Sequence, residues 1–138
     1  VMVQKEVAER MAASPGGKEY GALSVAVQFY SVPTIITKAE PSCFIPQPKV
    51  ASSVIKLELC GKPRVSVKNK AVFFKTVKSA FGQRRKTLVN ALSKSPYFSL
   101  EKEKAAEALR KLGFDENIRG EKLSLEDFAR LSDLICTE

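Results

Sequence analysis

Apolar residues alternate with polar ones in the first part of the chain, and in the second part they recur every three to four positions. The alternation predicts strands, because successive side chains of a strand point to opposite faces of a sheet. The predicted strands lie at 1–3, 23–30, 34–37 and 50–59. An amphipathic helix is expected at 5–13. Pro33 is expected to interrupt the strand region, and three prolines within 41–48 exclude a helix there.

The helical period begins beyond 61–63, where glycine, lysine and proline mark a boundary. The predicted helices lie at 69–81, 85–92, 100–112 and 125–135. The expected N-caps are Asn69 and Ser99, and Ser124 is expected to form a capping box with Asp127. Gly82 and Gly113 are expected to end the first and third of these helices. The chain is therefore predicted to hold an α/β segment (1–60), a linker (61–68) and an all-α domain (69–138).

The α/β segment is too small to cover both faces of its own strands. We therefore expect apolar strand surface to remain open and the chain to be prone to self-association through its strand edges. The same argument predicts that more of the sheet lies N-terminal to this chain.

The residue types exclude several classes of chemistry. The chain has no histidine, and its three cysteines lie far apart, so neither a zinc site nor a Ser–His or Cys–His hydrolase is expected. No apolar run approaches the roughly 18–20 residues that span a bilayer, and the charged N-terminus is unlike a signal peptide. A reduced, cytoplasmic protein without a metal or membrane partner is the expectation.

The formal net charge of +8 is concentrated in one stretch. Segment 1–58 has six basic and five acidic side chains, and segment 101–138 has seven basic and ten acidic ones. Segment 59–100 has ten basic side chains and no acidic one. Such a concentration favours a polyanionic partner, because each neutralised phosphate releases condensed counterions, although a solvated basic face is the alternative.

Two motifs are candidates for contacts with nucleic acid. The proline-rich segment 44–54 presents Phe44 in a rigid turn where it could stack on an unpaired base, although these residues alone favour an aromatic packed beneath a loop. The second motif is a run of three cations at the start of the helix predicted over 85–92, where the helix dipole disfavours them. Phosphate binding, aided by free backbone N–H groups, explains this run better than a solvated face does. The candidate RNA-binding residues are Arg84, Arg85, Lys86, Lys75, Lys78 and Asn90.

The order and content of several segments resemble the bacterial small-subunit ribosomal RNA adenine dimethyltransferases. These segments are 1–8, 20–25, 44–54, 81–90 and 119–124. The resemblance covers essentially the whole chain. The phenylalanine–proline motif is shared with the antibiotic-resistance methyltransferases of large-subunit RNA, whereas the run of residues 83–88, QRRKTL, is much more particular to the small-subunit family.

The resemblance implies a fold and an activity. Segment 1–60 would be the C-terminal part of a Rossmann-like methyltransferase domain, and segment 69–138 a small helical domain that contacts RNA. The whole enzyme would transfer four methyl groups from S-adenosylmethionine to the exocyclic amines of two adjacent adenines near the 3′ end of small-subunit RNA. Its partner would be the immature small ribosomal subunit. Phe44, with Pro46, would stack on the target adenine.

Two motifs of that family are missing from this chain. It has no G-x-G pattern for the methyl donor and no Asn-Leu-Pro-Tyr motif for the adenine amine, and Pro96-Tyr97 lies in the helical domain and is no substitute. We therefore expect a chain that lacks the donor-binding half of the enzyme, binds RNA, and neither binds S-adenosylmethionine nor catalyses alone. The alternatives are a large-subunit resistance methyltransferase and a non-catalytic RNA-binding assembly factor.

Overall fold

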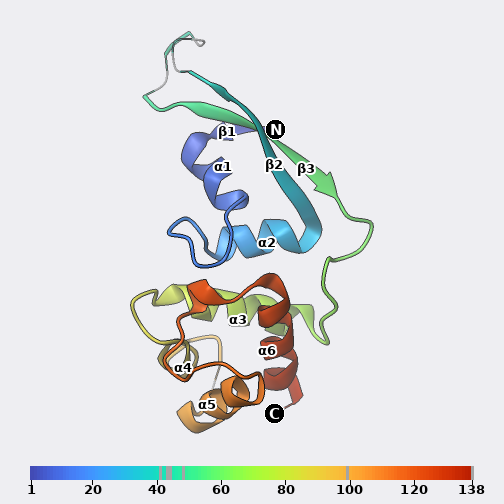
Figure 1. Ribbon diagram of the computed structural model, residues 1–138, viewed down its shortest axis with the longest axis vertical. Helices are drawn as coiled ribbons and strands as arrows, with labels where there is room; N and C mark the ends of the chain where they lie inside the picture. The colour runs from blue at the N-terminus through green and yellow to red at the C-terminus, as the bar shows by residue number, and fades with distance from the viewer. Residues whose placement is uncertain (41, 43–44, 48, 99, 138) are drawn as a thin grey trace. The chain divides into compact units, whose positions relative to one another are not determined.

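The computed structural model describes residues 1–40, 42, 45–47, 49–98 and 100–137 (Figure 1). The chain divides into two compact units, Val1–Arg64 and Val65–Glu138. The first unit contains β1 (Met2–Gln4), α1 (Lys5–Met11), α2 (Ala22–Tyr30), β2 (Ser31–Ala39) and β3 (Ser52–Leu59). The second contains α3 (Lys70–Gly82), α4 (Leu88–Ser93), α5 (Lys102–Lys111), the 3₁₀ helix η2 (Gly120–Lys122) and α6 (Leu125–Thr137). In the part of the chain that is described, no helix is long and apolar enough to cross a membrane.

The strands of the first unit form an antiparallel sheet in the order β1-β3-β2. Ile35 pairs with Ile55 across the β2–β3 ladder, and the register shifts between Ile35 and Thr37. The expected interruption at Pro33 is wrong, because Pro33 lies inside β2 opposite Leu57. Since β2 is an edge strand, the missing N–H of a proline can face away from the ladder.

The core of the first unit lies where α1 packs against β2 and β3. Ala8, Met11 and Ile55 are buried there, and half-buried apolar residues such as Val7 and Leu57 pack around them. Apolar side chains elsewhere on the strands remain exposed. They are Met2, Val32, Ile35, Ile36 and Leu59. This agrees with the expectation that so small a segment leaves apolar strand surface open.

The strand predicted over 23–30 is wrong, because these residues form most of helix α2. Apolar residues at alternate positions imitated a strand, but the structure buries Ser24, Val25 and Phe29, which share one face of a helix. The Ser24 hydroxyl accepts a hydrogen bond from the Gly21 N–H at 3.1 Å and donates to the carbonyl of Arg10. These bonds complete the start of α2 and join it to the end of α1.

The second unit is a helical bundle with a continuous apolar core. α3 contacts α4, α6 and η2, and α5 contacts α4 and α6. Fully buried core side chains are Phe73, Leu88, Leu92, Leu109, Leu123, Phe128 and Leu131. η2 approaches α3 closely, because a Cβ atom added to Gly120 would lie 2.8 Å from the Cβ of Ala80. Glycine is therefore required at position 120 for this contact.

Most of the expected helix caps of the second unit are confirmed. Asn69 accepts a hydrogen bond from the Val72 N–H at 3.2 Å and caps α3. Gly113 follows α5 with a φ of 82°, the left-handed conformation that favours glycine. Gly82 is the last residue of α3 and not a residue beyond it. The predicted cap Ser99 lies outside the described residues, and α5 begins after Glu101.

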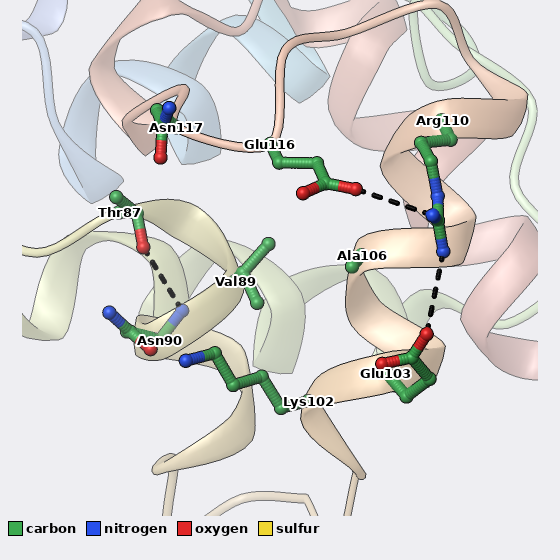
Figure 2. Close-up of a pocket in the computed structure, with 9 residues that line it drawn as sticks. All are labelled: Thr87, Val89, Asn90, Lys102, Glu103, Ala106, Arg110, Glu116 and Asn117. Carbon is green, nitrogen blue, oxygen red and sulfur yellow. Dashed lines mark hydrogen bonds and ion pairs between the residues drawn. The ribbon is translucent and has the colours of Figure 1, made fainter.

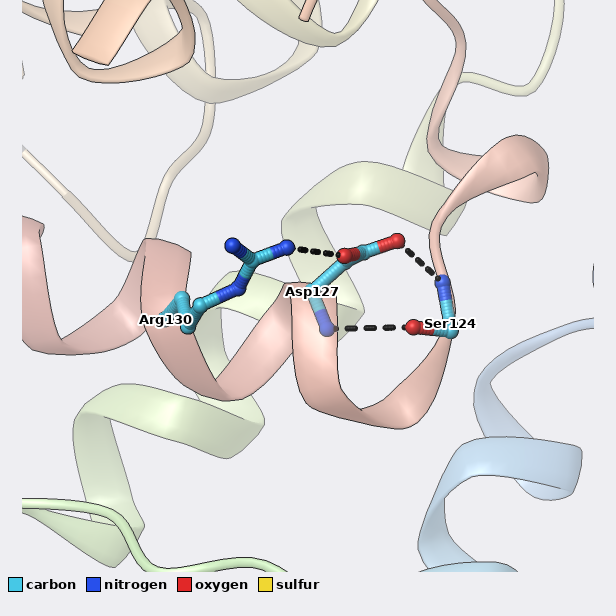
Figure 3. Close-up of polar contacts among 3 residues, drawn as sticks. All are labelled: Ser124, Asp127 and Arg130. Atoms are coloured by element: carbon cyan, nitrogen blue, oxygen red, sulfur yellow. Dashed lines mark hydrogen bonds and ion pairs between the residues drawn. The ribbon is translucent and has the colours of Figure 1, made fainter. Parts of the chain in front are cut away.

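The predicted capping box at the start of α6 is also confirmed (Figure 3). The Ser124 N–H donates to the Asp127 carboxylate at 3.1 Å, and the Asp127 N–H donates to the Ser124 hydroxyl at 3.2 Å. Arg130 donates to the same carboxylate at 2.6 Å. Burial opposes ionisation of Asp127, but the hydrogen bonds from Ser124 and the charge of Arg130 outweigh it and lower the pKa of this carboxyl below its ordinary value.

Candidate nucleic-acid interface

The three consecutive cations lie in an exposed turn between α3 and α4. We call residues 83–86, which contain Gln83, Arg84, Arg85 and Lys86, the basic turn. The prediction that these cations open a helix is wrong, because α4 begins at Leu88, after the basic turn. The helix dipole therefore does not disfavour these cations in the way expected, and this argument for phosphate binding over a solvated face is lost.

The expected supply of free N–H groups at the start of α4 is largely absent. The Leu88 N–H donates to the carbonyl of Ile118 at 2.7 Å. The Asn90 N–H donates to the hydroxyl of Thr87, the N-cap, at 3.4 Å. Two of the first three N–H groups of this helix thus have protein partners. Any affinity of the basic turn for phosphate must come mainly from its side chains.

The basic turn is held in place by its neighbours while two of its cations stay available. The Lys86 N–H donates to the Gln83 carbonyl at 3.0 Å. Arg84 lies 3.5 Å from the carboxylate of Glu121, and its guanidinium carbon is 5.7 Å from the centre of the Phe81 ring. Within the described part of the chain, the side chains of Arg85 and Lys86 have no partner. They are the cations most available to an incoming polyanion.

Two further predicted RNA-binding residues lie on one exposed stripe of α3. Lys75 and Lys78 are exposed, and so are Ala71 and Gly82, one turn before and one turn after them. Residues three and four apart share one face of a helix. The stripe therefore leads along α3 towards the basic turn and extends the positive surface. The segment 59–100 that contains both has no acidic residue.

Asn90 lines a cavity of about 460 Å³ between α4, α5 and the segment that follows α5 (Figure 2). In this cavity Arg110 lies between two carboxylates, 3.7 Å from Glu103 and 3.4 Å from Glu116. With Lys102, the lining has two basic and two acidic side chains, so it offers no net positive charge to a phosphate backbone. Asn90 thus lines this cavity and not the smaller one that contains Gln83 of the basic turn.

A smaller cavity, of about 240 Å³, adjoins the basic turn itself. Its lining residues are Lys78, Ser79, Gly82, Gln83, Ala91, Ser95, Pro96 and Tyr97. None of them is acidic, and Tyr97 is exposed. Tyr97 is not among the site residues predicted from the sequence. Tyr97 is the one tyrosine of segment 59–100, which has no acidic residue, and this was the signal that could have identified it.

The proposed base-stacking residues belong to the first unit. Phe44 lies outside the described residues, so the structure does not place its ring. Pro46 lies between β2 and β3 and is exposed. Among the described residues, no three His, Cys, Asp or Glu side chains are grouped in a way that could hold a metal ion.

The cavity described in the first unit does not suit the methyl donor. It has a volume of about 270 Å³, and its lining residues are Glu6, Glu9, Arg10, Lys18 and Glu19. All five are charged, whereas the sites that bind small organic molecules are lined mostly by apolar and aromatic side chains. These residues therefore do not fit the adenine and thioether parts of S-adenosylmethionine.

Comparison with known proteins identifies one family along the chain. The family model described as ribosomal RNA adenine dimethylase matches residues 1–136. The ribosomal RNA small subunit methyltransferase A of Lachnoclostridium phytofermentans is 53% identical over 135 residues, which cover 98% of this chain and 47% of that protein. That of Alkaliphilus oremlandii is 54% identical over 133 residues, which cover 96% of this chain and 46% of that protein. The chain thus spans about half the length of the curated relatives it matches.

Solved structures give a consistent picture of the fold. A dimethyladenosine transferase from Plasmodium falciparum matches with a TM-score of 0.74 and 26% identity, over 94% of this chain and 54% of that one. The 23S rRNA methyltransferase ErmE matches with a TM-score of 0.61 and 19% identity, over 98% of this chain and 53% of that one. The small sheet and the helices of this chain are therefore shared with ribosomal RNA methyltransferases.

Proposed function

Because the chain belongs to the ribosomal RNA adenine dimethylase family, we propose that it is the C-terminal part of an enzyme that dimethylates adenines of small-subunit ribosomal RNA. The observation that carries this proposal is the similarity to small-subunit methyltransferases, at 53 and 54% identity along almost the whole chain. The run of residues 83–88, QRRKTL, resembles the small-subunit enzymes more than the resistance enzymes and supports the same choice.

The proposed reaction transfers methyl groups from S-adenosylmethionine to the exocyclic amines of two adjacent adenines near the 3′ end of small-subunit RNA. An adenine must leave its base stack before its amine can reach a methyl donor. In this proposal, Phe44 and Pro46 stack on the extruded adenine. The charged cavity lined by Glu6, Glu9, Arg10, Lys18 and Glu19 does not fit the donor. We assign no step of the transfer to this chain and propose that it is inactive alone.

The part of the chain that we propose to engage RNA is the basic turn with the α3 stripe. Arg85 and Lys86 are exposed and have no protein partner among the described residues, and Lys75 and Lys78 extend the positive surface along α3. Arginine and lysine side chains bind phosphate oxygens and release counterions from the nucleic acid. The proposed partner is accordingly the RNA of the immature small ribosomal subunit.

A chimeric enzyme tests this proposal directly. Residues 1–136 of this chain would replace the matching part of the Lachnoclostridium phytofermentans relative, and the chimera would be expressed in a bacterium that lacks its own small-subunit adenine dimethyltransferase. Primer extension would then map dimethylated adenines in both ribosomal RNAs. We expect methylation of two adjacent adenines near the 3′ end of small-subunit RNA.

Other outcomes of this experiment would contradict the proposal. Methylation of large-subunit RNA would identify the chain as part of a resistance-type enzyme. An expressed and folded chimera that methylates neither RNA would favour a non-catalytic assembly factor. Titration calorimetry of the 138-residue chain with S-adenosylmethionine provides the complementary result. We expect no saturable heat, and a micromolar site would contradict the proposal that the donor is held elsewhere.

A further inference from the structure

We propose that the small cavity beside the basic turn holds one unpaired base of the bound RNA, with the ring of Tyr97 as its stacking platform. This inference rests on the proposed RNA binding and adds to it a site for a single base. Neither Tyr97 nor Gln83 is charged. These two residues would contact the base, whereas the cations of the basic turn would contact phosphates.

The size of the cavity suits one ring system. Its volume is about 240 Å³, which is less than the roughly 300–1,000 Å³ of pockets that enclose drug-sized ligands. A base that has left its own stack can regain a stacking interaction from a single aromatic ring that lies against one of its flat faces. The Tyr97 side chain is suited to provide that face, because the residue is 47% exposed. The Lys78 ammonium lies 6.0 Å from the centre of the same ring.

A directional chain of hydrogen bonds holds Tyr97 in place. The Ser79 hydroxyl donates to the carbonyl of Lys75 at 2.7 Å, which uses its only proton. The contact of 2.6 Å between the hydroxyls of Ser79 and Ser95 must therefore have Ser95 as its donor. The Ser95 oxygen in turn accepts from the Tyr97 N–H at 3.1 Å.

Because Ser79 and Ser95 are both buried, this chain fastens the backbone of Tyr97 to α3. An aromatic ring on a fixed backbone loses less conformational freedom on binding than one on a mobile loop. The ring of Tyr97 is thus both exposed and anchored, a combination that favours recognition of a ligand over simple packing.

The remaining wall of the cavity has the chemistry that a nucleotide needs. The side-chain amide of Gln83 offers a donor and an acceptor, which are the groups that pair with the edge of a base. The Lys78 ammonium on the same wall is suited to a phosphate. The cavity adjoins the basic turn through Gln83, so a strand whose phosphates contact Arg85 and Lys86 could place its next base there. The larger cavity of this unit has two carboxylates and two cations on its wall, so it lacks the net positive charge found beside the basic turn.

The test uses the whole chain and an RNA hairpin from the 3′ end of small-subunit ribosomal RNA, with fluorescent 2-aminopurine placed at one loop position at a time. We expect binding to quench the fluorescence at one position, because stacking on a tyrosine ring quenches this base. Y97F keeps the ring and should keep the quenching. Y97A and Y97L remove the ring, and Y97L retains apolar bulk. Both should abolish the quenching and weaken binding about five- to 150-fold.

The salt dependence separates this inference from the proposed function. Y97A removes no charge, so the slope of log affinity against log salt should stay that of the unchanged chain. If Y97A binds as tightly as the unchanged chain and still quenches at the same position, the base site is wrong and RNA binding by the basic turn stands. If the unchanged chain does not bind the hairpin, the proposed RNA-binding function fails and the base site fails with it. Circular dichroism spectra of the variants check that each is folded.

Discussion

At the scale of single residues, the cations of segment 59–100 differ in how available they are. Arg84 lies near Glu121 and above the Phe81 ring, so part of its charge is already compensated. Arg85 and Lys86 extend from a turn whose backbone is closed by a hydrogen bond of 3.0 Å between Lys86 and Gln83. Arg85 and Lys86 are therefore presented together on a short segment with a closed backbone, which suits a ligand with closely spaced phosphates.

Replacement of Arg84, Arg85 and Lys86 with alanine should weaken binding to the ribosomal RNA hairpin. Each cation that neutralises a phosphate contributes about 0.9 to the salt slope on a duplex, so the slope should fall by up to about two to three. Fluorescence anisotropy at several salt concentrations measures both the affinity and the slope.

The control for this prediction is a pair of lysines on α5. Lys102 and Lys104 are exposed, as are Arg85 and Lys86, so the variants R85A/K86A and K102A/K104A are matched in charge and exposure. The first should lose much more affinity than the second, because Lys102 and Lys104 lie among acidic neighbours. An equal loss in the two variants would mean that the basic turn is only a solvated face.

Asp127 allows a second prediction at this scale. Its carboxylate accepts hydrogen bonds from Ser124 and Arg130, and its pKa is lowered from the ordinary value of 3.8. A carboxyl with a lowered pKa stabilises the fold above the unfolded-state pKa, and this contribution is lost as the pH falls through the folded-state pKa. D127N should therefore lower the free energy of unfolding at neutral pH by about 0.5–2 kcal/mol. The difference from the unchanged chain should shrink as the pH falls below about 3.8.

Denaturant unfolding at a series of pH values tests this prediction. E126Q is the matched control, because Glu126 is an exposed carboxylate in the same first turn of α6. E126Q reports the interaction of a charge with the helix dipole without the capping bonds, and it should cost less. A D127N penalty that stays constant down to pH 2 would show that ionisation of Asp127 does not stabilise the fold.

At the scale of helices and strands, local sequence signals predicted some elements and misled on others. The caps of α3 and α6 were predictable, because Asn69 and the Ser124–Asp127 pair act on backbone groups within three residues of themselves. α2 was not, because its apolar residues alternate like those of a strand and the deciding contact, from Ser24 to Arg10, comes from another helix. The start of α4 was also misplaced, since the Leu88 N–H finds its partner at Ile118, thirty residues away.

The candidate site shows the same division between local and distant information. The cations of the basic turn were evident from the sequence, because charge and position along the chain suffice to identify them. The cavity beside the turn was not. It depends on a contact between Ser95, which follows α4, and Ser79 of α3, and on the hydrogen bond from the Tyr97 N–H to Ser95. No pattern of spacing along the chain reports such contacts.

The contact between η2 and α3 leads to a prediction about packing. The substitution G120A should destabilise the helical unit by about 1–3 kcal/mol. The added Cβ would lie 2.8 Å from the Ala80 Cβ and 3.2 Å from the Ala80 carbonyl oxygen. Denaturant unfolding measures the loss. A80G should recover part of it in the double variant, and this recovery would identify the clash as the cause.

Gly82 provides the control for the packing prediction. A Cβ added at this position of α3 meets nothing within 4 Å. G82A should therefore be neutral or stabilising by up to about 1 kcal/mol, as alanine is preferred to glycine in a helix. If G120A were as well tolerated as G82A, η2 and α3 would not be packed as tightly as the structure indicates.

At the scale of the whole molecule, the two units differ in how completely they bury their apolar residues. The helical unit has a core in which α3, α4, α5 and α6 all contribute fully buried side chains. The sheet of the first unit ends in β1 and β2, and Val32, Ile35, Ile36 and Leu59 remain exposed. Edge strands with exposed apolar side chains pair readily with other chains. We therefore expect the isolated chain to self-associate through its first unit.

Sedimentation velocity over a range of concentrations measures this association, and a single substitution can locate it. Ile36 is 57% exposed and lies at the register shift of the edge strand β2, so a lysine there should block strand addition and shift the chain towards monomer. Ile45 is fully exposed between β2 and β3 and outside both strands. I45K therefore makes the same chemical change away from the edge and should leave the association unchanged.

If I36K and I45K restore the monomer equally, general apolar contact drives the association and the strand edge has no special part in it. A chain that stays monomeric at high concentration without any substitution would mean that the exposed residues of β2 are too few to hold two copies together.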